Sequence, residues 1–442
     1  MRCRQHVTWL VAGWLICTLS ARAQEPLQLT LKEAVQRGLE RNVGVLVAAT
    51  RVEEAAASRT RQMARLLPQL TASALLNRQT VNLKAFGIDF PGMPAIVGPF
   101  SLVDFRLFLQ QALLDLPNFF GLQASEQRQK AAQLSYQDAR DFTILVVSTL
   151  YLHGQATGAR VEAAKTRVAT AQALYDLARD QKETGIATGV DVLRAQVQLA
   201  HERQRLLEAE NELKRAKLAL ARTIGLDLAT PLELAEPLEF TPLPVATLEE
   251  ALTAALAHRP DYLALQAQRT AVEQERKAAR SRYLPRLGVE AHYGAIGRTP
   301  AEARATHLLQ GVVTLPLFDW DRRGHLQEAD SRLQRLEHQL ADMRAAVEQE
   351  VREARLNLES AEQQVDVARQ GRELAQRELE MARDRFQAGV TNNIEVISAQ
   401  DALARADENY ILALTRHIEA KAALARALGT TEQIYQRYLG IQ

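Results

Sequence analysis

Two very long runs of helical pattern dominate the arrangement of hydrophobic and polar positions. About 65 residues without proline extend from near Asn118 to Thr184 and again from near Asp321 to Ala388, with alanine and leucine recurring every three or four positions. Each run closes at a glycine, and about 35 further residues of helical pattern follow it. Because a helix rises about 1.5 Å per residue, each long run would span about 100 Å, which is wider than a globular core. The pattern therefore predicts long antiparallel helical hairpins.

Four shorter segments alternate between apolar and polar residues. They lie at residues about 69–79, 101–111, 286–296 and 307–315. In the second of them, one face would consist of Val103, Phe105, Leu107 and Leu109. Each segment is about ten residues long, which is the length of a tilted transmembrane strand. Alternating strands also occur in soluble sheets, but such a sheet needs a packed partner layer, and the chain offers no other sheet-forming sequence.

Polar residues of these segments are expected to face a wet lumen. They are Arg78, Asp104, Arg106, Glu290 and His292. Trp320 follows the last segment and is either an anchor at a membrane interface or a packed corner residue.

The number of predicted strands requires other copies of the chain. Four strands cannot close a barrel, and open sheet edges are not tolerated in lipid. Two copies would give eight strands, a barrel barely wider than its own side chains, and three copies would give twelve.

The chain also carries an internal repeat. Thr30–Ala34 returns as Thr247–Ala251 at an offset of 217, and Ala178–Asp180 returns as Ala382–Asp384 at an offset of 204. The change of offset places 13 extra residues in the first half, and the segment Thr80–Phe100, rich in glycine and proline, is their natural host. The fold class we expect is mainly α with a small β part, built by tandem duplication.

The repeat suggests a division of the chain. It comprises a secretory signal peptide at 1–23, a first repeat at 24–230, a linker at 231–245, a second repeat at 246–430 and a C-terminal tail at 431–442. The two hairpins would turn near 185–190 and 389–394. A basic start, a short apolar core and the Ala21-Arg22-Ala23 end indicate the signal peptide, with a retained anchor as the alternative.

Composition narrows the function further. Both cysteines lie in the first 23 residues, and removal of that segment would change the formal net charge from +1 to −2. A nucleic-acid partner is therefore not expected, because it would call for a basic domain. The histidines show no ligand spacing, and no phosphate loop or nucleophile motif is present. We expect no metal, no cofactor and no catalytic residues.

An ordered set of motifs resembles the TolC-type outer membrane efflux protein family. It includes Leu29–Ala34 followed by Asn42, the segment Leu315–Asp319, and the paired turns Gly185–Leu193 and Gly389–Ile397. The resemblance covers essentially all of residues 29–430. It implies a homotrimer with a twelve-stranded barrel in the outer membrane and a helical barrel in the periplasm. It also implies two partners, a periplasmic adaptor protein and an inner-membrane pump or ABC transporter.

The resemblance gives the two hairpin turns a function. Their local roles are ordinary, because glycine ends helices in the left-handed conformation and acids favour helix starts. The family adds adaptor docking at Gly185, Ile186, Gly389 and Val390, and pore-mouth acids at Asp191 and Glu395. Lys182 and Ser398 depart from the family, which often has an aromatic residue and sometimes an acid there. The expected function is a passive exit duct for efflux or type I secretion; the alternative is a periplasmic coiled-coil adaptor or scaffold without a pore.

Overall fold

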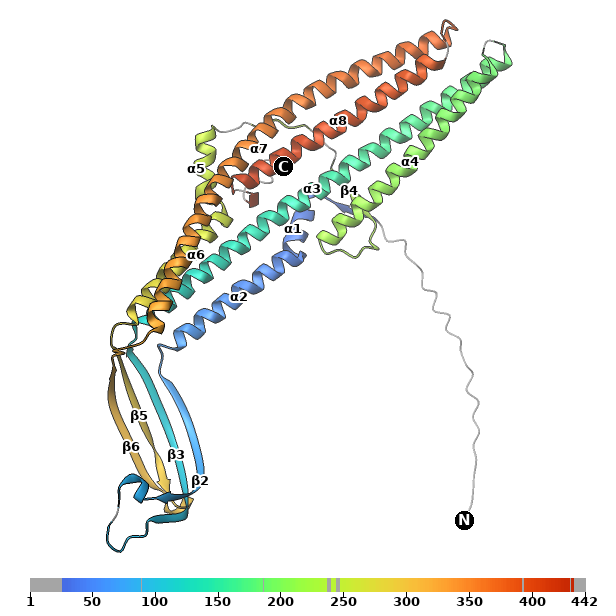
Figure 1. Ribbon diagram of the computed structural model, residues 1–442. Coiled ribbons are helices and arrows are strands. Elements are labelled where there is room, and N and C mark those ends of the chain that lie inside the picture. Colours follow the sequence, from blue (N-terminus) through green and yellow to red (C-terminus); the bar gives the residue numbers. More distant parts are fainter. Residues whose placement is uncertain are drawn as a thin grey trace, which may run out of the picture.

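The molecule is elongated, with a bundle of long helices above a curved four-stranded sheet (Figure 1). The structure is a computed structural model. It describes residues 26–88, 90–185, 187–236, 240–243, 247–391, 393–429 and 431–432. The predicted signal peptide, parts of the predicted linker and most of the predicted tail lie outside these residues. Within them, no helix is both long and apolar enough to cross a membrane.

The two halves of the chain contain the same order of main elements. The first half contains β1 (Leu27–Leu29), α1 (Leu31–Arg41), α2 (Val43–Ala64), β2 (Gln69–Asn82), β3 (Ile96–Leu114), α3 (Leu116–Glu183) and α4 (Gly189–Thr223). The second half contains β4 (Leu232–Leu234), α5 (Leu248–His258), α6 (Pro260–Ser281), β5 (Arg286–Gly297), β6 (Arg304–Thr314), α7 (Asp321–Gln387) and α8 (Asn393–Ala427). The helices α3 and α7 have 68 and 67 residues, which corresponds to about 100 Å each.

Local signals explain where several helices begin. The hydroxyl of Thr30 accepts a hydrogen bond from the backbone N–H of Glu33, and the Glu33 carboxylate accepts one from the backbone N–H of Thr30. Thr247 and Glu250 form the same reciprocal capping box at the start of α5. Both boxes satisfy amide groups that the first helical turn leaves without partners.

The four long strands form one antiparallel sheet in the order β2-β3-β5-β6. The two hairpins, far apart in sequence, therefore lie side by side through the pairing of β3 with β5. Strands β2 and β3 are longer than the predicted ranges, because pairing continues to Asn82 and Ile96 toward the connecting loop. The strands β2 and β6 are the two edges of this sheet.

The register separates an apolar face of the sheet from a polar one. Phe105, Leu107 and Leu109 pair with Ala295, Tyr293 and Ala291, so their side chains share one face. The opposite face carries Asp104 with Arg106, and Glu290 with His292, as their alternation predicted. Arg78 was expected with them, but it pairs with Ser101 and lies on the apolar face. It stands near the end of β2, beside the loop, where a long cationic side chain can reach water from an apolar surface.

Trp320 is 74% exposed and meets Phe318 edge to face at 5.4 Å between ring centroids. In the described chain Trp320 therefore contacts an aromatic neighbour without being buried, and the interface anchor and the packed corner residue both stay predictions.

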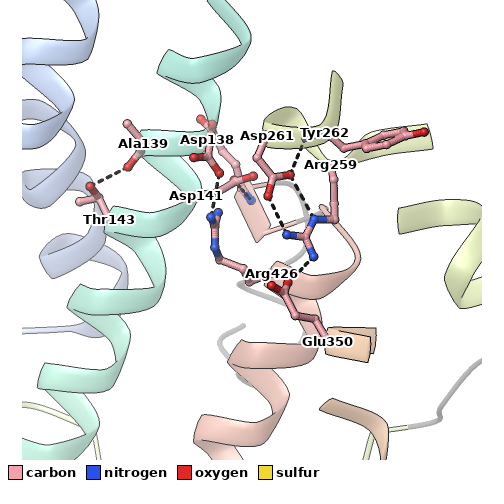
Figure 2. A network of polar contacts seen from close by, with 10 residues as sticks. Asp138, Ala139, Asp141, Thr143, Arg259, Asp261, Tyr262, Glu350 and Arg426 are labelled. Atoms are coloured by element: carbon pink, nitrogen blue, oxygen red, sulfur yellow. Dashed lines mark hydrogen bonds and ion pairs between the residues drawn. The ribbon is translucent and has the colours of Figure 1, made fainter. Parts of the chain in front are cut away.

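A seam of charged residues lies where the halves meet and continues into the second half (Figure 2). Arg426 of α8 donates to Asp138 of α3 at 2.7 Å, and the backbone N–H of Glu432 donates to Asp141 at 3.2 Å. Arg259 donates to Asp261 and to Glu350. Burial is the main reason why the pKa of Asp141 is raised to about 6.

Candidate functional site at the tips of the helical hairpins

Each hairpin turns at a glycine in the left-handed conformation. Gly185 has φ of 78° and Gly389 has φ of 69°. The N–H of Gly389 donates to the carbonyl of Phe386 at 3.0 Å, and that of Val390 donates to the carbonyl of Arg385 at 3.1 Å, a Schellman pattern. At both glycines, no atom lies within 4 Å of the position that a Cβ would occupy. Backbone conformation, and not crowding, is therefore the reason for glycine here.

The first tip is closed by a capping box. The hydroxyl of Thr188 accepts from the N–H of Asp191 at 3.4 Å, while the Asp191 carboxylate accepts from the N–H of Thr188 at 3.0 Å. The hydroxyl also donates to that carboxylate at 2.6 Å. These hydrogen bonds from Thr188 hold the pKa of Asp191 below its usual value. The side chain is only 14% exposed, so this acid is engaged by its own turn.

The second tip leaves its acid more open. Glu395 lies in the first turn of α8, its side chain is 46% exposed, and it pairs with Arg385 at 3.5 Å. Val390 is 70% exposed. The two predicted acids are thus not equivalent: one stabilises a helix start and the other projects into a mostly open surface.

The two tips are joined by a residue that the sequence did not single out. Asn393, the first residue of α8, is fully buried, and its amide nitrogen donates to the backbone carbonyl of Asp191 at 2.8 Å. Beside it, Phe386 and Val396 pack with Leu174 and Ala195 in an apolar cluster that draws on all four hairpin helices. An asparagine at a helix start reads as a cap, so sequence alone gave no signal of this cross-contact.

The structure places the other predicted site residues as follows. Gly185 and Gly389 stand at the two turns, and Val390 follows the second turn at the surface. Ile186 lies outside the described residues. Lys182 is exposed, whereas its counterpart Phe386 is buried. Over the described part of the chain, no group of three His, Cys, Asp or Glu residues could hold a metal ion.

Comparison with known proteins agrees with this architecture. The model of the outer membrane efflux protein family matches residues 34–226 and 251–430. The chain is 25% identical to the toluene efflux pump outer membrane protein TtgC of Pseudomonas putida, over 65% of this chain and 60% of that protein. It is 23% identical to the alkaline protease secretion protein AprF of Pseudomonas aeruginosa, over 98% of this chain and 90% of that protein.

The fold is also similar to solved structures. The outer membrane protein VceC of Vibrio cholerae superposes with a TM-score of 0.80 at 18% identity, over 90% of this chain and 96% of that one. The matched segment spans less than two thirds of TtgC, while the family model covers most of this chain. The chain belongs to the outer membrane efflux protein family.

Proposed function

We propose that this chain is one protomer of an exit duct in the outer membrane, which conducts substrates passively for an efflux pump or a type I secretion system. The two-faced sheet carries the proposal: one face is apolar and exposed, with Leu76 at 78% and Leu309 at 76% exposure, and the other is polar. Such a division suits strands between lipid and water. The names of TtgC and AprF, an efflux pump component and a secretion protein, support this class of function.

The open sheet edges support assembly as a trimer. Strands β2 and β6 each have only one neighbour in the described sheet. Pairing β2 of one copy with β6 of the next would cover these edges, and three copies would give a closed barrel of twelve strands. The helical hairpins of the three copies would then continue the duct into the periplasm.

The purified chain should therefore form pores. Reconstituted into planar lipid bilayers, it should give discrete conductance steps and migrate as a trimer after chemical crosslinking. A protein that remains monomeric in detergent and gives no conductance would contradict the proposal.

The tips are the proposed docking site for a periplasmic adaptor. The adaptor would in turn connect the duct to an inner-membrane pump or transporter. Gly185, Ile186, Gly389 and Val390 would form the contact. The support is exposure: Val390 is an apolar residue 70% open to solvent at the far end of a hairpin. Val390→Cys should crosslink to an adaptor in cells. Val367→Cys, which is equally exposed but lies on α7 well before the tip, should not. Equal crosslinking at both positions would refute docking at the tip.

Asp191 and Glu395 are proposed as acids near the pore mouth, and the geometry ranks them. Glu395 is more exposed, and Asp191 is bound to Thr188, so Glu395 would contribute more to ion selection. Glu395→Gln should lower the cation preference measured as a reversal potential across a KCl gradient. An unchanged reversal potential would place Glu395 away from the ion path.

A further inference from the structure

The two β-hairpins pair their strands in the same register. In the first hairpin, Leu70 pairs with Leu109. In the second, Leu287 lies 217 residues after Leu70 and pairs with Val313. Val313 in turn lies 204 residues after Leu109, so the offsets of the internal repeat relate the two pairs. Eleven successive pairs of the first hairpin recur in the second in this way. Residue for residue, β5 is therefore the equivalent of β2, and β6 is the equivalent of β3.

The junction in the middle of the sheet joins equivalents of the two edge strands. The strand order is β2-β3-β5-β6, and β3 pairs with β5 in an antiparallel arrangement. Because β6 is equivalent to β3 and β2 is equivalent to β5, the edge β6 of one copy can meet the edge β2 of a second copy as β3 meets β5. The β3–β5 junction thus supplies a template for pairing between copies.

We propose that β6 of one copy pairs with β2 of the next in the register of the β3–β5 junction, so that Thr314 lies opposite Ser73 of the next copy. The template is the pair of Gln110 with Glu290. The offsets of 204 and 217 relate these two residues to Thr314 and Ser73. This register rests on the proposed exit duct, in which copies of the chain share one barrel, and it fixes which residues of two copies meet.

The side chains that this register brings together on the polar face are alike. Hydroxyl faces hydroxyl, apolar faces apolar and amide faces amide at three positions, Thr314 with Ser73, Val312 with Leu75 and Gln310 with Asn77. A slip of two residues would set the apolar Val312 opposite Asn77 or Ser73 instead. A slip of one residue would place the apolar face of one copy beside the polar face of the next. Matching cross-strand pairs stabilise a sheet, so they favour the proposed register over its neighbours.

The same register covers two large apolar side chains at the end of β6. After a bulge, Leu114 pairs with Leu287 at the last position of the β3–β5 junction. The equivalents of these residues are Phe318 and Leu70 of the next copy, which are 78% and 68% exposed in the single chain. Strand β6 would therefore extend from Thr314 to Phe318 where a second copy is present.

Disulfide formation between copies tests the register in the full chain in detergent. Ala74→Cys combined with Val313→Cys, and Ser73→Cys combined with Thr314→Cys, place thiols at two neighbouring opposed positions. Successive antiparallel pairs alternate in spacing, so one of the two is the closer, non-hydrogen-bonded kind. Oxidation with copper phenanthroline should link at least one of these double variants into covalent dimers and trimers.

The reaction reports only on contacts between copies. Within one chain, two strands separate β2 from β6, so the introduced thiols lie about 14 Å apart, too far for a disulfide. The two native cysteines, both in the first 23 residues, are replaced by serine so that only the introduced thiols react.

Two control variants represent slipped registers. Leu76→Cys or Ala72→Cys, each combined with Val313→Cys, places the thiols two residues out of register in opposite directions. Both should give about tenfold less linked product, because diagonal positions are too far apart for a disulfide. Before oxidation, every variant should give the conductance steps of the original chain, which establishes that it folds and assembles.

Three results would contradict the register in different ways. Stronger linkage in a slipped pair than in both proposed pairs would overturn the register and leave the exit duct intact. Pores and trimers without linkage at any pair would show that copies meet through other strands. A chain that stays monomeric and forms no pores would overturn the exit duct itself, and the register with it.

Discussion

The two halves share one plan of elements but stabilise it differently where the short helices pack against the long ones. In the first half, the core consists of large side chains such as Leu29, Ile144, Tyr151 and Leu220. In the second half, the corresponding core is rich in alanine, including Ala251 and others along α5, α7 and α8. Buried charges lie beside it instead. The same backbone arrangement is thus stabilised by buried apolar area in the first half. In the second half it is stabilised by closely packed helices together with buried ion pairs.

This difference predicts different vulnerabilities. Loss of apolar volume should damage the first half, and loss of one charge should damage the second. Melting temperatures of variants, followed by the helical circular dichroism signal in detergent, can separate the two cases.

The largest effect is expected at Arg259. Its side chain is 5% exposed and binds both Asp261 and Glu350. Arg259→Met would leave the half-buried Asp261 without its cation, and breaking such a pair costs about 3–5 kcal/mol. The control is Arg352→Met, which removes a surface pair with Glu348 and should cost less than about 1 kcal/mol. Equal melting temperatures for the two variants would contradict the importance of the charged seam.

Leu220→Ala is the matching change in the first half. Leu220 is 1% exposed in the large-residue core, so truncation should cost about 3 kcal/mol through lost burial and a residual cavity. Leu207→Ala on the same helix, at a side chain 67% exposed, should shift the melting temperature little. If the two variants have the same melting temperature, apolar packing is not the main source of stability in this half.

A smaller, pH-dependent effect is expected at His417. This residue is fully buried, and neither ring nitrogen has a partner among the described residues. Burial, and then the nearby Lys421, lowers its pKa to about 4. The folded state therefore holds the neutral ring, and the stability that this contributes is complete above about pH 6.5 and is lost as the pH falls toward 4. At pH 5 the loss should be about 2 kcal/mol.

His417→Leu is the natural test, because the position at the offset of 204 in the first half is Leu213. The stability of the variant relative to the original chain should increase as the pH falls from 7 to 5. The contribution of Asp141 to stability has the opposite pH dependence, since its raised pKa favours the folded state at low pH. Because both chains contain Asp141, this contribution cancels in the difference between their stabilities. A constant difference over this range would mean that His417 does not titrate as expected.

The sequence predicted the elements set by local signals and missed the contacts that link distant segments. The threonine–glutamate caps and the glycine turns depend on a few neighbouring residues, so they could be read directly. The contact of Asn393 with Asp191 joins residues 202 positions apart, and the burial of Gln400 depends on how two hairpins align. Arg78 was placed on the wrong face because its charge was weighed above its position in the alternation.

The smallest effect concerns the tips, where the comparison of the two halves is sharpest. Thr188→Ala would remove the hydroxyl that caps α4 and binds Asp191, and such a cap is worth about 1 kcal/mol. Amide hydrogen exchange at residues 188–192 should therefore accelerate about fivefold, while Thr166→Ala, on the exposed surface of α3, should not change it. The exchange at 393–397 should stay the same, because the backbone carbonyl that Asn393 contacts is retained. Acceleration at both tips would show that they open as one unit.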